Sequence, residues 1–135
     1  MALNEFSLIK QYFADATQKR QDVIVDIGDD CAVLCCPEDS DIAISIDTLV
    51  SGIHFFADVD PFTLGHKSLA VGLSDLAAMG AIPAWFTLAL TLPELDENWL
   101  SAFAEGMTAL ASQHDIQLVG GDTTKGPLTI SIQVH

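Results

Sequence analysis

The sequence predicts one α+β domain in which two main helices cover a mixed or antiparallel β-sheet. Three observations lead to this fold class. The chain has 135 residues, of which 50% are apolar, and this is enough for a single domain with a buried core. Short runs rich in β-branched residues are separated by turn residues, as in strands. Two longer segments carry apolar residues at helical spacing and alternate with these runs, so helices and strands should pack as layers.

The first third of the chain is predicted to hold a short helix and three strands. Residues 5–15 should be helical, because Asn4 is a favourable N-cap and five apolar residues follow at helical spacing: Phe6, Leu8, Ile9, Tyr12 and Phe13. Residues 23–27 and 31–36 are typical of strands flanking a tight turn. Residues 42–46 form a third predicted strand, with Ala43 and Ser45 on the face opposite three isoleucines.

The rest of the chain is predicted to hold the two main helices and three more strands. Asp60 and Pro61 begin a helix that runs to about Met79, where Gly80 stops it. Residues 85–92 form a buried strand, and Asp96 caps the second helix. The apolar face of that helix is predicted to be Trp99, Leu100, Phe103, Met107, Leu110 and Ala111. Residues 116–119 and 128–134 form two further strands, joined by a glycine-rich loop at 120–126.

The charge and the apolar pattern exclude several classes of function. Five basic residues against 19 acidic ones give a net charge of −14, which repels nucleic acid and anionic membrane surfaces. The first ten residues show no secretory signal, and the longest apolar run, 84–92, is far too short to span a membrane. Three cysteines without metal-binding spacing predict reduced thiols in the core of a cytoplasmic protein.

The distribution of the acidic residues points to a bound cation. Fourteen of them are Asp, and residues 21–66 contain ten acidic residues but no Lys or Arg. Hard cations such as Mg²⁺ or Ca²⁺ prefer carboxylate oxygens. The alternative is that these Asp residues are scattered helix caps and turns, and composition alone leaves both interpretations open.

Four carboxylates stand out as candidate ligands: Asp30, Asp47, Asp75 and Asp122. Asp75 lies in an apolar helical stretch, where an ionised group is costly unless it is paired or binds a metal, although it could also face solvent. Asp30 should lie in a turn, Asp47 directly after a strand and Asp122 in the glycine-rich loop. For each of these three, a turn or cap role is the alternative.

Two further features could contact a ligand, and neither supplies a catalytic nucleophile. The backbone of Gly120 and Gly121 could present N–H groups to a phosphate, or it could form a plain hairpin turn. His54 could contact a ligand or be a structural histidine. No arrangement of Ser, His and Asp residues indicates nucleophilic catalysis, and no P-loop is present, so no residue is assigned as a general base.

Five segments taken in order carry a family resemblance: IGDDCA (27–32), SIDTLVSGIHF (45–55), KSLAVGLSDLAAMGA (67–81), PAW (83–85) and GGDTT (120–124). They resemble the thiamine-monophosphate kinases, which belong to the aminoimidazole-ribonucleotide-synthetase-like superfamily of ATP-dependent enzymes. The resemblance implies that residues 1–135 are an N-terminal domain that binds ATP and Mg²⁺. It also implies a homodimer whose sheets join into a barrel, and a C-terminal domain that this chain lacks. One departure is Gly72, where the family usually has Asn.

The resemblance assigns ligand roles to individual positions. Five side chains and one backbone carbonyl match the Mg²⁺ ligands of the family: Asp30, Ser45, Asp47, Asp75, Asp122 and the carbonyl of Ile46. Gly121 and Asp122 match nucleotide contacts, and His54 matches a contact to thiamine monophosphate. The chain stops directly after its last predicted strand, which predicts that it is a fragment of a longer protein.

The implied reaction is transfer of the γ-phosphoryl group of ATP to thiamine monophosphate, which gives thiamine diphosphate. A phosphate monoester has a second pKa of about 6, so the acceptor is largely deprotonated at neutral pH and needs no strong base. Several Mg²⁺ ions would offset the repulsion between the two anions. The chain alone is expected to be inactive. Two alternatives remain: another ATP-dependent synthetase of the superfamily, and a non-catalytic acidic module for metal binding or dimerisation.

Overall fold

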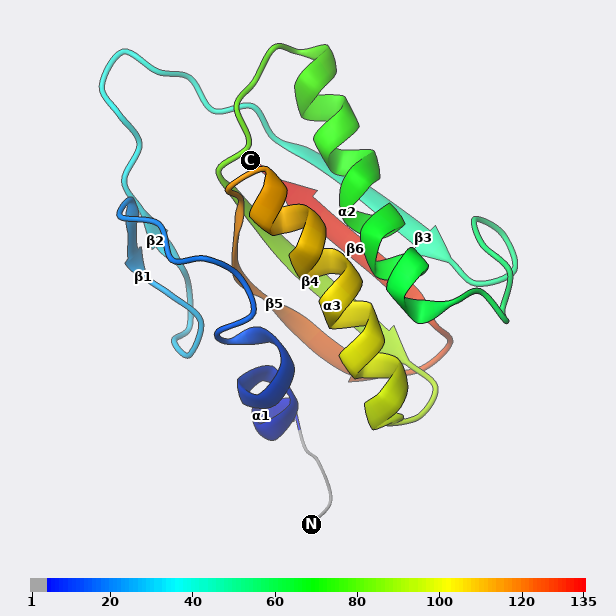
Figure 1. Cartoon of the computed structure of the whole chain (residues 1–135). Coiled ribbons are helices and arrows are strands. Elements are labelled where there is room, and N and C mark those ends of the chain that lie inside the picture. The colour runs from blue at the N-terminus through cyan, green and yellow to red at the C-terminus, as the bar shows by residue number, and fades with distance from the viewer. Residues whose placement is uncertain (1–4) are drawn as a thin grey trace.

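The computed structural model describes residues 5–135 and shows a four-stranded sheet with two long helices on one face (Figure 1). The helices are α2 (Pro61–Ala78) and α3 (Glu97–Gln113). The strands of the sheet are β3 (Ser45–Val50), β4 (Trp85–Leu92), β5 (Gln117–Lys125) and β6 (Thr129–Val134). A short helix, α1 (Glu5–Leu8), continues into a π-helical segment, η1 (Ile9–Phe13). A separate ribbon consists of β1 (Val23–Val25) and β2 (Val33–Leu34).

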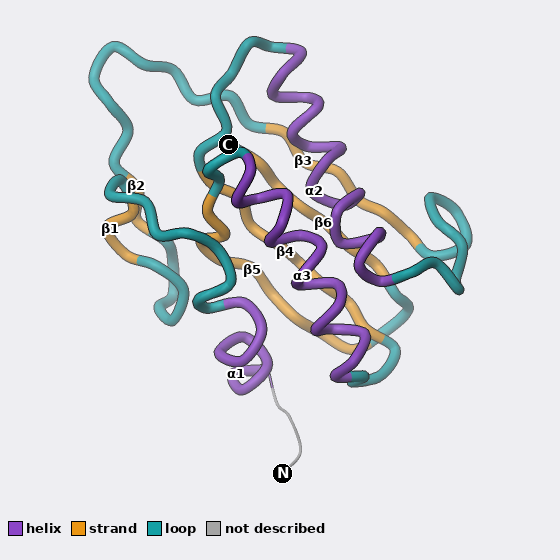
Figure 2. The backbone as a smooth tube through the Cα atoms, viewed as in Figure 1, coloured by secondary structure: helices purple, strands orange, loops and turns teal. Residues whose placement is uncertain are grey.

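The main sheet is mixed, in the order β3-β6-β4-β5. Strand β6 pairs antiparallel with both β3 and β4, whereas β4 and β5 pair in parallel. Helices α2 and α3 lie side by side over the same face, as the ribbon and tube views both show (Figures 1 and 2). The predicted α+β class and its two covering helices are therefore confirmed.

The two long helices begin where their N-caps predict. The Asp60 carboxylate accepts a hydrogen bond from the backbone N–H of Thr63 at 3.0 Å, and Asp96 accepts one from Trp99 at 3.1 Å. Both satisfy N–H groups that the first turn of a helix leaves free. The predicted apolar face of α3 is confirmed, since Leu100, Phe103, Met107, Leu110 and Ala111 are buried and Trp99 packs against the core.

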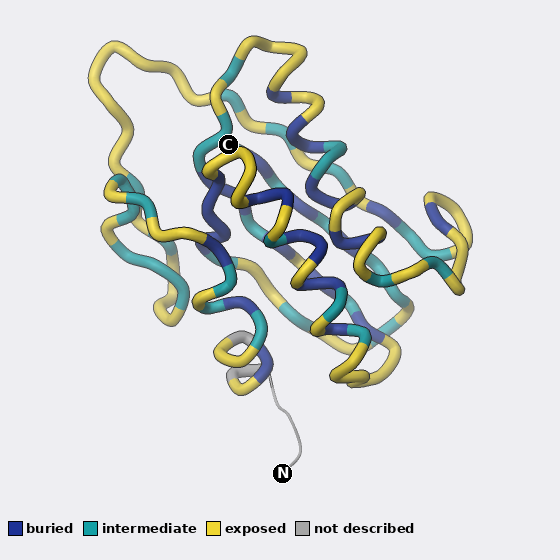
Figure 3. Tube along the Cα trace, in the orientation of Figure 1, coloured by how far each residue is buried: buried dark blue, intermediate teal, exposed yellow. Residues whose placement is uncertain are grey.

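The core lies between the helices and the inner face of the sheet. Residues alternate between buried and less buried along β6, which is the pattern of a strand covered on one face (Figure 3). The largest buried side chains of this layer include Leu64, Leu69, Leu76, Phe86, Leu90, Leu100, Phe103, Met107, Ile130 and Ile132. No helix within residues 5–135 is both long and apolar enough to cross a membrane.

Two strand predictions in the main sheet are wrong in their bounds. The strand predicted at residues 42–46 is β3, which runs over Ser45–Val50, so Asp47 lies inside it and not after it. Its position is set by pairing with β6, from Ser45 opposite Val134 to Val50 opposite Thr129. The isoleucines that suggested the earlier strand are exposed: Ile42, Ile44 and Ile46.

The glycine-rich segment at 120–126 is also mostly strand and not loop. Strand β5 continues to Lys125, because it pairs in parallel with β4 along that strand as far as Leu92. Asp122 therefore lies within a strand at the edge of the sheet.

The N-terminal third also differs from its prediction. The strands expected at 23–27 and 31–36 shorten to β1 and β2, and the predicted helix at 5–15 becomes α1 with the π-helical segment η1. The N-cap predicted at Asn4 lies outside the described residues. Cys31, Cys35 and Cys36 are free thiols, but they are exposed and not in the core, because they lie on the small outer ribbon and its loop.

Candidate functional site

Asp47 and Asp75 form an acidic pair between strand β3 and helix α2. Residues two apart on a strand share a face, so Ser45 and Asp47 point to the same side of β3 as the buried Leu49. Asp75 lies near the C-terminal end of α2, and its Oδ2 accepts a hydrogen bond from Ser45 Oγ at 3.0 Å. Asp75 is exposed, so it is not sealed in the apolar layer. Its sequence neighbours Leu73 and Leu76 are buried instead.

The electrostatics of this pair favour a cation. Asp47 Oδ2 is buried and has no hydrogen-bond partner. The pKa of Asp47 is raised, first by burial of its carboxyl group and then by the Asp75 carboxylate, which repels an ionised Asp47 and can accept a hydrogen bond from a protonated one. The salt bridges of the described chain all involve Lys19 or Arg20, so no basic side chain neutralises the pair.

The oxygen atoms of this pair and of Ser45 are suitable ligands for a metal ion. A buried carboxylate oxygen without a partner, a second carboxylate and a hydroxyl form a hard oxygen donor set of the kind that Mg²⁺ prefers. The Ser45, Asp47 and Asp75 side chains therefore fit a divalent cation that completes its coordination with water or phosphate oxygens.

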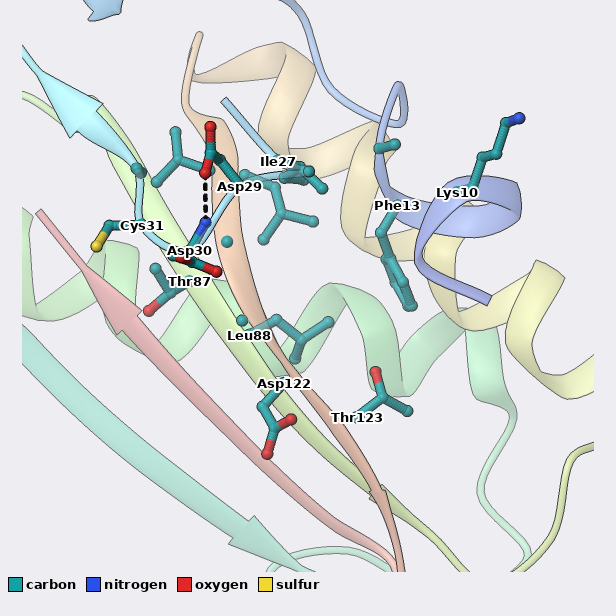
Figure 4. A pocket seen from close by; sticks show the side chains of 17 residues that line it. Lys10, Phe13, Ile27, Asp29, Asp30, Cys31, Thr87, Leu88, Asp122 and Thr123 are labelled. Carbon is teal, nitrogen blue, oxygen red and sulfur yellow. Dashed lines mark hydrogen bonds between the residues drawn. The ribbon is translucent and has the colours of Figure 1, made fainter. Parts of the chain in front are cut away.

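Asp30 and Asp122 lie elsewhere, in a cavity of about 660 Å³. This is the size of a typical small-molecule site. Its walls come from η1, from the turn at residues 27–32, and from β4 and β5 (Figure 4). Apolar side chains of Phe13, Ile27 and Leu88 line it beside these two carboxylates.

Glycine allows the β5 wall of this cavity to form. Gly121 has a φ of 154°, and a Cβ atom there would collide with the backbone carbonyl of Leu88 on β4. Only a residue without a side chain lets β5 pass so close to β4 at this point. On the opposite wall, Asp29 Oδ1 accepts a hydrogen bond from the backbone N–H of Asp30 at 2.9 Å, which orders the turn (Figure 4).

His54 has a structural role in this conformation. Its Nδ1 accepts a hydrogen bond from the backbone N–H of Val50 at 2.9 Å, and its carbonyl accepts one from Lys67 Nζ at 2.7 Å. His54 is exposed but is not among the residues that line the cavity. Ile46 is 62% exposed, on the face of β3 that points away from α2.

The predicted ligands are thus found in two places. One place joins Ser45, Asp47 and Asp75, and the other joins Asp30 with Gly121 and Asp122. Within residues 5–135, no group of three or more His, Cys, Asp or Glu side chains lies close enough to hold one ion.

One basic residue of the cavity was not predicted from the sequence. Lys10, on η1, contributes to its lining, and its amino group is directed away from Asp29 and Asp30 (Figure 4). No local motif marks this lysine, because only the packing of η1 against α3 in the folded chain brings it to the cavity.

Fold and site together define a class: an α+β domain that presents carboxylates and a glycine-rich strand to a ligand cavity. Residues 28–135 match the family model described as AIR synthase related protein, N-terminal domain, and the chain belongs to this family.

Individual proteins similar to this chain include thiamine-monophosphate kinases. The thiamine-monophosphate kinase of Salmonella typhimurium is 58% identical over the whole chain, which spans 42% of that relative's length. The crystal structure of thiamine-monophosphate kinase from Stenotrophomonas maltophilia K279a superposes with a TM-score of 0.81 at 53% identity, over 86% of this chain and 37% of that one. A structure described as AaThiL complexed with AMPPCP and TMP matches with a TM-score of 0.65 at 25% identity, over 99% of this chain and 43% of that one.

Proposed function

We propose that this chain is the N-terminal, ATP- and Mg²⁺-binding part of a thiamine-monophosphate kinase. The observation that carries the proposal is 58% identity to such a kinase over all 135 residues. The related structure that holds AMPPCP and TMP supports ATP and thiamine monophosphate as the substrates. The kinase proposal concerns the longer protein, because the chain spans less than half of that relative.

The acidic residues would hold the metal ions. Ser45, Asp47 and Asp75 would bind one Mg²⁺ through their oxygens, and Asp30 and Asp122 would bind metal or nucleotide beside the cavity. Mg²⁺, when bound, supplies positive charge that offsets repulsion between the phosphates. Without it, a chain with a net charge of −14 would repel ATP. The backbone carbonyl of Ile46 and the side chain of His54 remain proposed contacts, to Mg²⁺ and to thiamine monophosphate respectively.

The chain's own residues bind and orient the reactants, and none acts as a base. The acceptor phosphate carries a second pKa of about 6 and is already an oxyanion at pH 7. An oxygen of that phosphate forms a bond to the γ-phosphorus while the bond to the β,γ-bridging oxygen breaks, and ADP leaves. The backbone at Gly120 and Gly121 lines the cavity and would contact a phosphate group of the nucleotide.

We also propose a homodimer and a cytoplasmic location. The helices cover one face of the sheet and leave Ile46 and Ala89 exposed on the other, which supports pairing of two sheets. Free cysteines on an exposed ribbon support a reducing compartment.

The test is a chimaera in which this chain replaces the matching segment of the Salmonella typhimurium relative. We expect the chimaera to convert thiamine monophosphate and ATP into thiamine diphosphate and ADP in equal amounts, only when Mg²⁺ is present. The 135-residue chain alone should give little or no product. A folded chimaera that makes no thiamine diphosphate would contradict the proposal.

A further inference from the structure

Gln117 is a buried polar residue at the start of strand β5, with an exposed fraction of only 1%. A buried amide is costly unless its polar atoms are hydrogen-bonded. Its Oε1 accepts a hydrogen bond from the backbone N–H of Arg20 at 2.6 Å, and its Nε2 donates one to Asp26 Oδ2 at 3.1 Å. Both bonds join β5 to the segment around the β1–β2 ribbon.

Asp26 links Gln117 to the turn that forms one wall of the cavity. Its Oδ1 accepts a hydrogen bond from the backbone N–H of Ile27 at 2.7 Å, and its Oδ2 also accepts one from Lys19 Nζ at 2.8 Å. Ile27 is the first residue of the turn that lines the cavity with Asp29 and Asp30. Strand β5 supplies the facing wall only a few residues after Gln117.

Apart from the packing of Ile27 against the core and the ion pair of Asp26 with Lys19, the turn has few contacts that hold it in place. Strand β1 has three residues and pairs only with the two residues of β2, and an isolated two-stranded ribbon is marginally stable. The hydrogen bond from Trp85 Nε1 to Asp22 Oδ1, at 3.0 Å, anchors the start of this ribbon. At the end that leads into the turn, the described side-chain bond to β5 is the one between Gln117 and Asp26.

We infer that Gln117 and Asp26 are positioning residues for nucleotide binding: their hydrogen bond holds the turn at residues 27–32 against β5 and so fixes the width of the cavity. This inference rests on the proposed function, because it takes the ligand of the cavity to be ATP with Mg²⁺. Neither side chain lines the cavity, so each acts through the turn.

The test separates this hydrogen bond from the rest of the network. Gln117→Glu keeps the size of the side chain and the acceptor for Arg20, but it replaces the donor to Asp26 with a carboxylate oxygen. The double variant Asp26→Asn, Gln117→Glu exchanges donor and acceptor between these two side chains and restores their bond. It also removes the ion pair of Asp26 with Lys19, so Lys19→Met, which removes that ion pair alone, is its matched control. The control is Ser68→Ala, which removes a buried hydrogen bond of 2.7 Å to Leu64 in α2, away from the cavity lining.

Binding of MgATP to the 135-residue chain is measured by calorimetry, below the melting temperature of every variant. We expect affinity to fall at least about tenfold in Gln117→Glu, to recover in the double variant, and to stay unchanged in Ser68→Ala. Amide hydrogen exchange in residues 27–32 should be faster in Gln117→Glu than in the wild type. It should return to the wild-type rate in the double variant Asp26→Asn, Gln117→Glu. If Gln117→Glu does not fold, Asp26→Asn takes its place, because that side chain is 31% exposed, and it is compared with Lys19→Met to separate the loss of the ion pair from the loss of the bond to Gln117.

Wild-type affinity and wild-type exchange in a folded Gln117→Glu would overturn the inference. Failure of the swapped pair to recover either property would overturn it as well. If the wild-type chain does not bind MgATP, the proposed function is contradicted for this chain. The exchange measurement then still decides whether Gln117 holds the turn.

Discussion

Asp47 is the residue whose chemistry demands the most explanation. Its Oδ2 is buried without a hydrogen-bond partner, and its pKa is raised by burial and by Asp75. A carboxyl group whose pKa is higher in the folded state than in the unfolded state stabilises the fold while it is protonated. That stabilisation is complete below its ordinary pKa of 3.8 and is lost as the pH rises through the raised value.

The first prediction is a pH dependence that Asp47→Asn removes. In metal-free buffer, we expect this variant to gain melting temperature relative to the wild type as the pH rises from about 3 to 7, since only the wild type must ionise this carboxyl group. Thermal denaturation of both proteins across this range measures the difference. Asp58→Asn, at an exposed position, is the control, and a difference for Asp47→Asn that does not vary with pH would refute the prediction.

The second prediction concerns Mg²⁺ itself. At ten times its dissociation constant, a ligand that binds only the folded state adds about 1.4 kcal/mol to the free energy of unfolding. We expect Mg²⁺ to raise the melting temperature of the wild type and to have less effect on Asp47→Asn and Asp75→Asn. Calcium serves as the comparison, because a non-catalytic calcium module would respond more to Ca²⁺. An undiminished response to Mg²⁺ in both variants would remove the acidic pair from the metal site.

At the scale of elements, the two long helices and strand β4 were predictable, whereas the bounds of β3 and β5 were not. Helices α2 and α3 each begin at an Asp N-cap, and these signals are local in sequence. Strand β3 contains Asp47, and β5 contains Asp122 and two glycines, which are residues that local propensity disfavours in a strand. Pairing with β6 and β4 determines where these strands end.

In the candidate site too, some residues could be predicted from the sequence and others could not. The sequence singles out Asp47 and Asp75 as unusual carboxylates, and the resemblance adds Ser45. That Ser45 and Asp75 share a hydrogen bond depends on how α2 packs on β3, which is a long-range contact that no spacing reveals. Gln117 and Lys10 escaped prediction for the same reason, since neither lies in a recognisable motif.

The third prediction tests the packing of the helix layer. A Cβ atom at Gly106 of α3 would collide with the backbone carbonyl of Phe62 on α2, so the two helices approach closely only without a side chain there. We expect Gly106→Ala to lower the free energy of unfolding by about 1–3 kcal/mol, as overpacking typically does. Chemical denaturation measures this loss. Ser101→Ala, on the exposed face of α3, should change stability by less than about 0.5 kcal/mol, and equal stability of the two variants would refute the prediction.

At the scale of the whole molecule, one face of the sheet is covered and the other is open. Thr48 and Ser131 share a hydrogen bond of 2.8 Å between their hydroxyl groups on the face away from the helices, and Ala89 is exposed on that same face. Small and β-branched side chains of this kind suit the packing of one sheet on another.

The fourth prediction is that this open face joins two copies of the chain. We expect the wild type to sediment as a dimer, and Ala89→Glu to shift it to a monomer, because a charge would be buried between the sheets. Analytical ultracentrifugation measures both. Ser101→Glu places the same charge on the exposed face of α3 and should leave the dimer intact. A wild-type chain that sediments as a monomer at all concentrations would refute this assembly for the isolated chain.

One measurement tests both the metal-binding role of Asp47 and Asp75 and the proposed reaction. The central claim is that this chain supplies the metal-loaded half of a kinase that acts on thiamine monophosphate. The measurement is the rate of thiamine diphosphate formation by the chimaera, titrated with Mg²⁺, for the wild type and for Asp47→Asn and Asp75→Asn. We expect Mg²⁺-dependent turnover that each variant lowers by about 10- to 100-fold at a fixed Mg²⁺ concentration. Equal turnover in wild type and variants, or turnover without a divalent cation, would contradict it.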